Sequence, residues 1–208
     1  MLVPFSLVAV SFLSGANLMP IHQTPNRLEQ LLNSTVKPPV ETTVALRDVQ
    51  PETPKEPRLI CKGCNDHENR TLAFLQDEGI KDKNALATIM GNIRQESTFV
   101  PNICEGGART SYHGCRYGGY GLIQWTDSTR YHGLGNHARK IGGDPSSLET
   151  QLSYLTSEPD WEMIEHSMKT PGKSIEGYMQ AAKRWIRWGH HGARTAFAYD
   201  YRSMITEG

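Results

Sequence analysis

The chain has 208 residues, 38% of them hydrophobic, which is enough for one globular domain with additional chain. Its 22 Lys and Arg residues are balanced by 22 Asp and Glu residues, so the formal net charge is zero. This balance gives no support to binding of nucleic acid or anionic lipid through a charged surface. It favours a substrate without dense phosphate, such as a glycan or a protein.

Residues 1–60 differ in composition from the rest of the chain. They hold eight of the twelve prolines and no Trp or Tyr, whereas residues 61–208 hold all four Trp and all eight Tyr. A Pro-rich segment without these rings has little to offset its ordering entropy. We therefore predict an extended arm and docking segment over 1–60, with one edge strand at 41–47, and a folded domain over 61–208.

The arm begins with an apolar segment, residues 2–19. A proline, a glycine and an asparagine interrupt it, which argues against a stable membrane span. Ser14 and Ala16 make a tolerable cleavage site, but no Lys or Arg precedes Arg27, so an atypical signal peptide leading to the host periplasm is an alternative. The other interpretation is a hydrophobic tail that packs on a partner protein.

Capping residues and apolar residues at helical spacing predict seven helices in the domain. They occupy residues 66–79, 82–96, a segment that begins at 126–128, and residues 144–155, 159–168, 174–189 and 193–204. The intervening stretch 101–125 is rich in glycine and turn residues, as in a loop or a small β-hairpin. The predicted fold class is α+β, mostly helical, with a glycine-rich lobe.

Glu96 lies on the apolar stripe of the second predicted helix, three residues after Ile93. Burial and the nearby helix C-terminus both disfavour a charged carboxylate and raise its pKa, as a general acid near neutral pH requires. The alternative is a structural ion pair with an arginine such as Arg94, Arg184 or Arg187.

Two motifs resemble those of a known family. They are GNIRQESTFVPN at 91–102, with Glu96-Ser97 at its centre, and GGYGLIQWT at 118–126, with its Gly-x-x-Gln. Together they are similar to the lysozyme-like domain of phage tail lysozymes, within the goose-type lysozyme and lytic transglycosylase group. The resemblance covers roughly residues 66–205 in element order. Ala198-Tyr199-Asp200 is similar to a late Ala-Tyr-Asn signature, with Asp in place of Asn.

The resemblance implies peptidoglycan as the substrate and Glu96 as the acid that protonates the glycosidic oxygen between N-acetylmuramic acid and N-acetylglucosamine. Gln124 would hydrogen-bond the sugar at the cleavage point. Trp125, Tyr117 and Tyr120 are candidates for flat faces against the sugar rings, with core packing as the alternative for the tryptophan. Gly118, Gly119 and the substrate-binding candidate Gly121 would let the backbone approach the glycan closely, with simple turn formation as the alternative.

A second carboxylate is the open question of the mechanism, because glycosidases usually use two. Asp127 is the first candidate and Glu105 the second, although the first also suits a helix N-cap and the second a solvated loop residue. If neither reaches the site, the N-acetyl group assists and the product is an anhydro sugar, which is lytic transglycosylase chemistry. No cofactor is required for either reaction.

The four cysteines allow more than one arrangement. Cys61 and Cys64 form a C-x-x-C pair, and Cys104 and Cys115 bracket the glycine-rich loop. They could form one structural zinc site, or Cys104 could pair with Cys115 in a disulfide that staples the loop. A redox role for the C-x-x-C pair is a third possibility.

Other functions compete with the glycosidase. A zinc amidase would want His-Glu-x-x-His, which is absent from the sequence, and a Cys–His peptidase using Cys104 or Cys115 with His113 or His132 has no supporting motif. A free endolysin and a non-catalytic structural tail protein are further alternatives. We favour a virion component in which residues 1–60 dock on phage tail or baseplate proteins, for local penetration of the cell wall.

Overall fold

The computed structural model describes residues 57–208; the apolar segment, the edge strand predicted at 41–47 and most of the predicted arm lie outside the described residues. The elements in chain order are β1 (Leu59–Cys61), α1 (Asp66–Asp77), α2 (Lys83–Ser97), a 3-10 helix η1 (Tyr112–Gly114), α3 (Ser128–Ile141), α4 (Leu148–Leu155), α5 (Pro159–Lys169), α6 (Ile175–Ile186), α7 (Arg194–Met204) and β2 (Ile205–Glu207). The fold class is α+β and mostly helical, which confirms the prediction.

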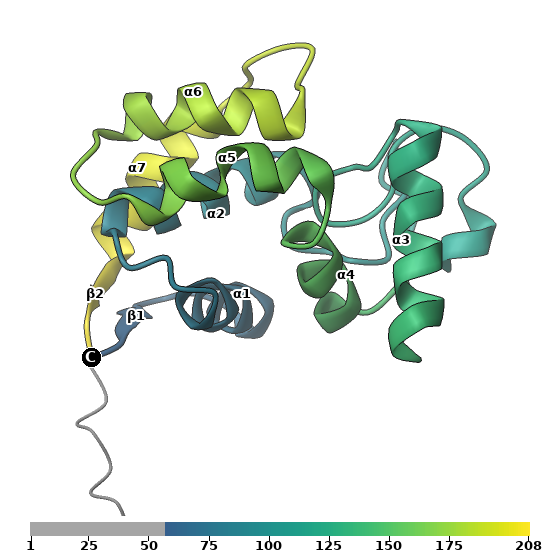
Figure 1. Ribbon diagram of the computed structural model, residues 1–208, viewed down its shortest axis with the longest axis horizontal. Coiled ribbons are helices and arrows are strands. Elements are labelled where there is room, and N and C mark those ends of the chain that lie inside the picture. Colours follow the sequence, from purple (N-terminus) through teal and green to yellow (C-terminus); the bar gives the residue numbers. More distant parts are fainter. Residues whose placement is uncertain (1–56) are drawn as a thin grey trace, which may run out of the picture. The chain divides into compact units, whose positions relative to one another are not determined.

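Helix α2 is the central element of the fold (Figure 1). It packs against α7 and α6 on one side and against α1 on the other. Every residue from Ala85 to Ile93 is buried, so the helix is enclosed on all sides over most of its length. The predicted stripe is correct, since Leu86, Ile89, Met90 and Ile93 are all fully buried.

Side-chain caps explain where the helices begin. Asn65 forms a capping box with Glu68 at the start of α1, and the carboxylate of Asp82 accepts hydrogen bonds from two backbone amides of α2. Asp127, Ser147 and Ser174 cap α3, α4 and α6 in the same way. These caps thus set the residue at which each helix begins.

Three features of the fold differ from the predicted elements. Helix α4 begins at Leu148 and not at residue 144, because Ser147 is its N-cap. Strands β1 and β2, which pair antiparallel and join the two ends of the described chain, were not predicted. Helix α6 ends at Ile186 and not at Gly189, because Arg187 takes a left-handed backbone conformation with φ +57°. The chain therefore leaves the helix three residues early and runs as an open segment to α7.

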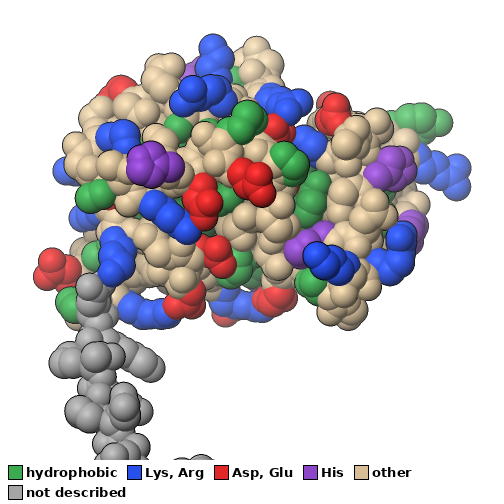
Figure 2. Space-filling model, in the orientation of Figure 1, with side chains coloured by type: hydrophobic (Ala, Val, Ile, Leu, Met, Phe, Trp, Pro, Cys, Tyr) green, Lys and Arg blue, Asp and Glu red, His purple; other side chains and the backbone are tan. Residues whose placement is uncertain are grey.

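The glycine-rich segment lies beside α3 at one end of the domain (Figure 1). It contains η1 and two isolated antiparallel bridges, Ile103 with Arg109 and Cys104 with Tyr120. Among the described residues no helix is both long and apolar enough to cross a bilayer. Lys, Arg, Asp and Glu side chains are interspersed over the face seen in Figure 2.

Candidate active site

A cleft of about 560 Å³ lies where three parts of the chain meet. One wall is the C-terminal end of α2, residues 95–98. The glycine-rich segment contributes residues 103–107, 123, 124 and 126, and the connection between α6 and α7 contributes residues 186–190 together with Arg194. The cleft therefore joins segments that are almost 100 residues apart in sequence.

Glu96 lines this cleft from the last turn of α2. Its side chain is 15% exposed, and it forms an ion pair with Arg194, whose side chain is only 4% exposed. Burial raises the pKa of Glu96 above its usual value, and the Arg194 guanidinium opposes this without reversing it. The carboxyl thus keeps its proton to a higher pH than an exposed glutamate does.

Arg194 is held in place by several contacts. Its Nη1 donates hydrogen bonds to the carbonyl oxygens of His190 and His191, at 3.2 and 2.9 Å. Its guanidinium carbon lies 4.9 Å from the ring centroid of Trp188. The ion pair of Glu96 is therefore anchored to the segment that follows α6.

Two of the three arginines named from the sequence have other partners. Arg94 lies 3.4 Å from Asp200 and stacks over the ring of Phe197, and Arg187 pairs with Asp160. The sequence allowed an ion pair of Glu96 with an arginine, but the arginine in the structure is none of those named. Arg194 is 98 residues away in sequence, and only the packing of α7 against α2 brings it to Glu96.

The two sequence motifs meet through one hydrogen bond. Ser97 Oγ, next to Glu96, donates to the carbonyl oxygen of Leu122 inside the Gly-x-x-Gln motif at 2.8 Å. Gln124 also lines the cleft, with φ +52° and its Nε2 donating to the carbonyl of Gly121 at 3.0 Å. Thr98 and Phe99 follow Glu96 with φ +50° and +60°, so non-glycine residues in left-handed conformations gather around the cleft.

A comparison with protein families supplies the deciding observation. The model of one family, described as phage tail lysozyme, matches residues 66–196. The chain belongs to the phage tail lysozyme family. Comparisons with curated proteins and with solved structures each found no match. Membership places this lysozyme-like domain among peptidoglycan-degrading glycosidases, either hydrolases or transglycosylases, and the family description fits an association with a phage tail.

Two aromatic residues expected to face sugars lie in the core of this phage tail lysozyme domain. Trp125 is fully buried, and its Nε1 donates to Glu158 at 3.2 Å. Tyr120 is also fully buried, with its hydroxyl bonded to the Thr110 carbonyl. Neither ring has a face open to a glycan, which corrects the expectation, because both rings fill the interior beneath the cleft-lining loop.

The other two substrate-binding candidates also lie outside the lining of the cleft. Tyr117 is 86% exposed and borders a separate hollow with Ser128 and His132. Gly121 is buried with φ +76°, and a Cβ there would lie 2.4 Å from the side-chain oxygen of Gln151. This close packing explains why position 121 holds a residue without a side chain.

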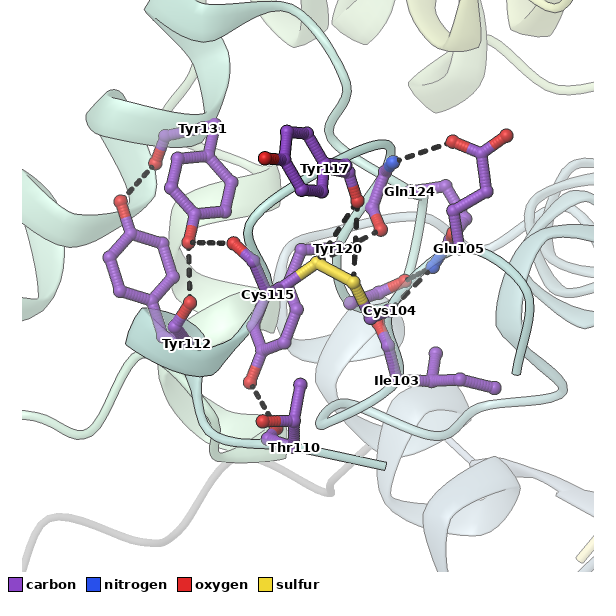
Figure 3. The surroundings of a disulfide bond; sticks show 12 residues. Ile103, Cys104, Glu105, Thr110, Tyr112, Cys115, Tyr117, Tyr120, Gln124 and Tyr131 are labelled. Carbon is purple, nitrogen blue, oxygen red and sulfur yellow. Dashed lines mark hydrogen bonds between the residues drawn. A yellow bond between two sulfur atoms is a disulfide. The ribbon is translucent and has the colours of Figure 1, made fainter. Parts of the chain in front are cut away.

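The candidate second carboxylates are placed differently. Asp127 is exposed, caps α3 through hydrogen bonds from Thr129 N and Arg130 N that lower its pKa, and does not line the cleft. Glu105 does line it. Its Oε2 accepts a hydrogen bond from Gly119 N at 3.0 Å, and its own amide donates to the Gly119 carbonyl, so the loop holds this carboxylate at the cleft (Figure 3).

The four cysteines form two separate disulfides, Cys61–Cys64 and Cys104–Cys115. Sulfurs joined in a disulfide carry no thiolate to ligate zinc, and no cluster of metal-ligating side chains occurs among residues 57–208. The single Cys₄ site is therefore not the arrangement in this structure. The Cys104–Cys115 bond staples the loop directly beside Glu105 (Figure 3).

Three residues that line the cleft were not predicted from the sequence, namely Trp188, His190 and Arg194. The available signal was weak, namely a Trp-Gly pair at the end of a strongly amphipathic helix followed by two histidines. Glu158, which is 1% exposed and bonded to two indoles, was also missed.

Proposed function

We propose that this protein is a muramidase that cleaves the bond between N-acetylmuramic acid and N-acetylglucosamine, with Glu96 as the general acid. The observation that supports this most is the position of Glu96: a largely buried carboxyl, with a raised pKa, in a cleft shared with the Gly-x-x-Gln motif. Such a carboxyl can hold a proton until a glycosidic oxygen arrives.

In the proposed reaction, Glu96 gives its proton to the glycosidic oxygen as the bond to the anomeric carbon breaks. Gln124 hydrogen-bonds the sugar at the cleavage point from the same cleft. Glu105 is the second carboxylate that we propose, because it lines the cleft and Asp127 does not. It stabilises the positive charge on the anomeric carbon. Water then adds to that carbon and gives its proton to the Glu96 carboxylate, which restores the acid. This chemistry uses the chain's own side chains and no cofactor.

The proposal is tested by mass spectrometry of the fragments released from purified peptidoglycan sacculi. A muramidase leaves reducing N-acetylmuramic acid ends. Anhydromuramic ends as the sole product would show transglycosylase chemistry, in which a hydroxyl of the sugar itself, assisted by its acetamido group, replaces water. Reducing N-acetylglucosamine ends or free stem peptides would contradict the proposed bond.

We also propose that the protein acts as part of a phage tail or baseplate, docked through residues 1–60, where it opens the cell wall locally. The family description supports the tail association. Mass spectrometry of purified particles tests it: the protein should be found in washed virions. Its detection only in lysates would favour a free endolysin or a periplasmic protein.

A further inference from the structure

The cleft contains one large aromatic side chain. Among the described residues that line it, Trp188 is the only Trp, Tyr or Phe. It lies two residues beyond the end of α6, in the connection that forms one wall of the cleft. The adjacent Gly189 has open space where a Cβ would stand, so this part of the wall is uncrowded.

The indole of Trp188 is held in a defined orientation. It packs partly buried against the apolar residues Ile175, Met179 and Ala198. The ring of His191 meets it edge to face, with centroids 5.6 Å apart. A ring fixed in this way loses little conformational freedom when a ligand binds, which favours affinity.

Trp188 is also linked to the proposed acid through one side chain. The Arg194 guanidinium lies over the indole, with its carbon 4.9 Å from the ring centroid, and the same guanidinium pairs with Glu96. The guanidinium covers one face of the indole, so a group that packs on the rest of the ring lies one side chain away from the Glu96 carboxyl. A sugar next to the cleaved bond would have to lie at about this separation from the acid.

We propose that Trp188 is the sugar-binding platform of the cleft and that it packs against the apolar C–H face of an N-acetylated pyranose beside Glu96. Trp188 thus takes the role expected from the sequence for Trp125, Tyr120 and Tyr117. The inference rests on the proposed function, because it assigns a substrate-binding residue to that same cleft.

The four tryptophans give a direct optical test. Trp125, Trp161 and Trp185 are 0–1% exposed, so Trp188 is the one whose surroundings change when a ligand enters the cleft. The probe is a series of soluble peptidoglycan glycan-strand fragments, titrated into the uncleaving Glu96→Gln variant. We expect a saturable change of tryptophan emission, with calorimetry of the same mixture giving the same dissociation constant.

Variants then separate binding from packing. Trp188→Leu in the Glu96→Gln background removes the aromatic face but keeps apolar bulk, and we expect about tenfold weaker binding by calorimetry. Trp188→Phe keeps a ring and should retain most of the affinity, which matters if the leucine variant folds poorly. The matched control is Tyr117→Leu, an exposed aromatic outside the cleft, which should bind as tightly as the parent.

Unchanged affinity in Trp188→Leu overturns the inference, as does calorimetric binding without any change of emission, or no binding at all. Equal losses in Trp188→Leu and Tyr117→Leu overturn it too, because they would move the platform away from the cleft. The proposed function fails on a different result, namely full hydrolytic activity of Glu96→Gln.

Discussion

At the scale of single residues, the site is governed by the pair Glu96 and Arg194. Burial raises the pKa of Glu96, and the facing guanidinium lowers it by a smaller amount. The raised pKa lets Glu96 keep its proton to a higher pH than an exposed glutamate does, and once the carboxyl is ionised its pairing with Arg194 holds it in a fixed place. Burial and the charge of Arg194 shift the pKa of Glu96 in opposite directions. The charge of Arg194 should therefore influence the pH above which Glu96 loses its proton and activity falls.

Replacing Arg194 by Gln should raise the pH above which activity falls. Loss of the cation removes the interaction that stabilises the Glu96 carboxylate, so the pKa of Glu96 rises and the protonated form persists to higher pH. We expect the basic limb of the pH profile of kcat/KM to move upward. Arg194→Lys keeps the charge and should move it much less. A downward shift in the glutamine variant would contradict this account of the site.

Asp127 and Glu105 can be separated by matched amide substitutions. Asp127→Asn keeps a good N-cap of α3 and should leave both activity and melting temperature nearly unchanged, whereas Asp127→Ala removes the cap and should lower the melting temperature. Glu105→Gln removes a cleft carboxylate, and we expect kcat to fall by about a hundredfold or more. These are measured by lysis rates and thermal unfolding. An inactive but stable Asp127→Asn protein would return the catalytic role to Asp127.

At the scale of secondary structure elements, the contact between α2 and α7 positions the site. Gly91 lies where the two helices cross, and a Cβ there would stand 2.6 Å from the backbone nitrogen of Ala198 and 2.9 Å from the carbonyl oxygen of Arg194. The glycine therefore lets α7 approach closely enough for Arg194 to reach Glu96.

Gly91→Ala should separate the two helices. Both neighbouring atoms belong to the backbone and cannot rotate away, so we expect a loss of about 1–3 kcal/mol in denaturant unfolding, together with reduced activity. Gly177→Ala in α6 is the control, because its added Cβ meets only side-chain atoms of Lys173 and Ser174, at 3.3 and 3.8 Å. That change should stay within about 1 kcal/mol. Equal effects of the two substitutions would argue against a close-packing role for Gly91.

The helices and their caps could be predicted because they depend on local sequence. Asn65, Asp82 and Asp127 are caps whose chemistry is visible within four residues, and the apolar spacing of α2 and α6 gave their buried faces. The β1–β2 pairing could not be predicted, since it joins short segments about 145 residues apart. The Glu96–Arg194 pair and the cleft position of Trp188 likewise depend on long-range packing that no local pattern encodes.

At the scale of the whole molecule, a buried charge network connects the two walls of the cleft. Glu158 accepts hydrogen bonds from the indoles of Trp125 and Trp185 and from the guanidinium of Arg130. Trp125 directly follows Gln124, and Trp185 lies in the last turn of α6. Asp160 extends the network to Arg187 at the edge of the cleft. One carboxylate thus fixes parts of both walls.

Glu158→Gln should be strongly destabilising. The substitution removes a buried negative charge that pairs with Arg130. It also replaces one carboxylate oxygen by an amide NH₂ group, which cannot accept a hydrogen bond from an indole N–H. We expect a loss of about 3 kcal/mol or more in the free energy of unfolding, measured in urea. Glu162→Gln on the exposed side of α5 is the control and should change stability by less than about 1 kcal/mol. A loss of less than about 1 kcal/mol in Glu158→Gln would show that the network contributes little to the stability of the fold.

The role of Glu96 as the proton donor is best tested by the lysis rate of a peptidoglycan suspension, measured for Glu96→Gln, Glu162→Gln and wild type. The amide cannot donate an acidic proton, so we predict a fall of about 10²–10⁴-fold in a protein whose circular dichroism and melting behaviour show that it is folded. The control should lyse at the wild-type rate. A folded Glu96→Gln protein that clears peptidoglycan as fast as wild type would contradict the account.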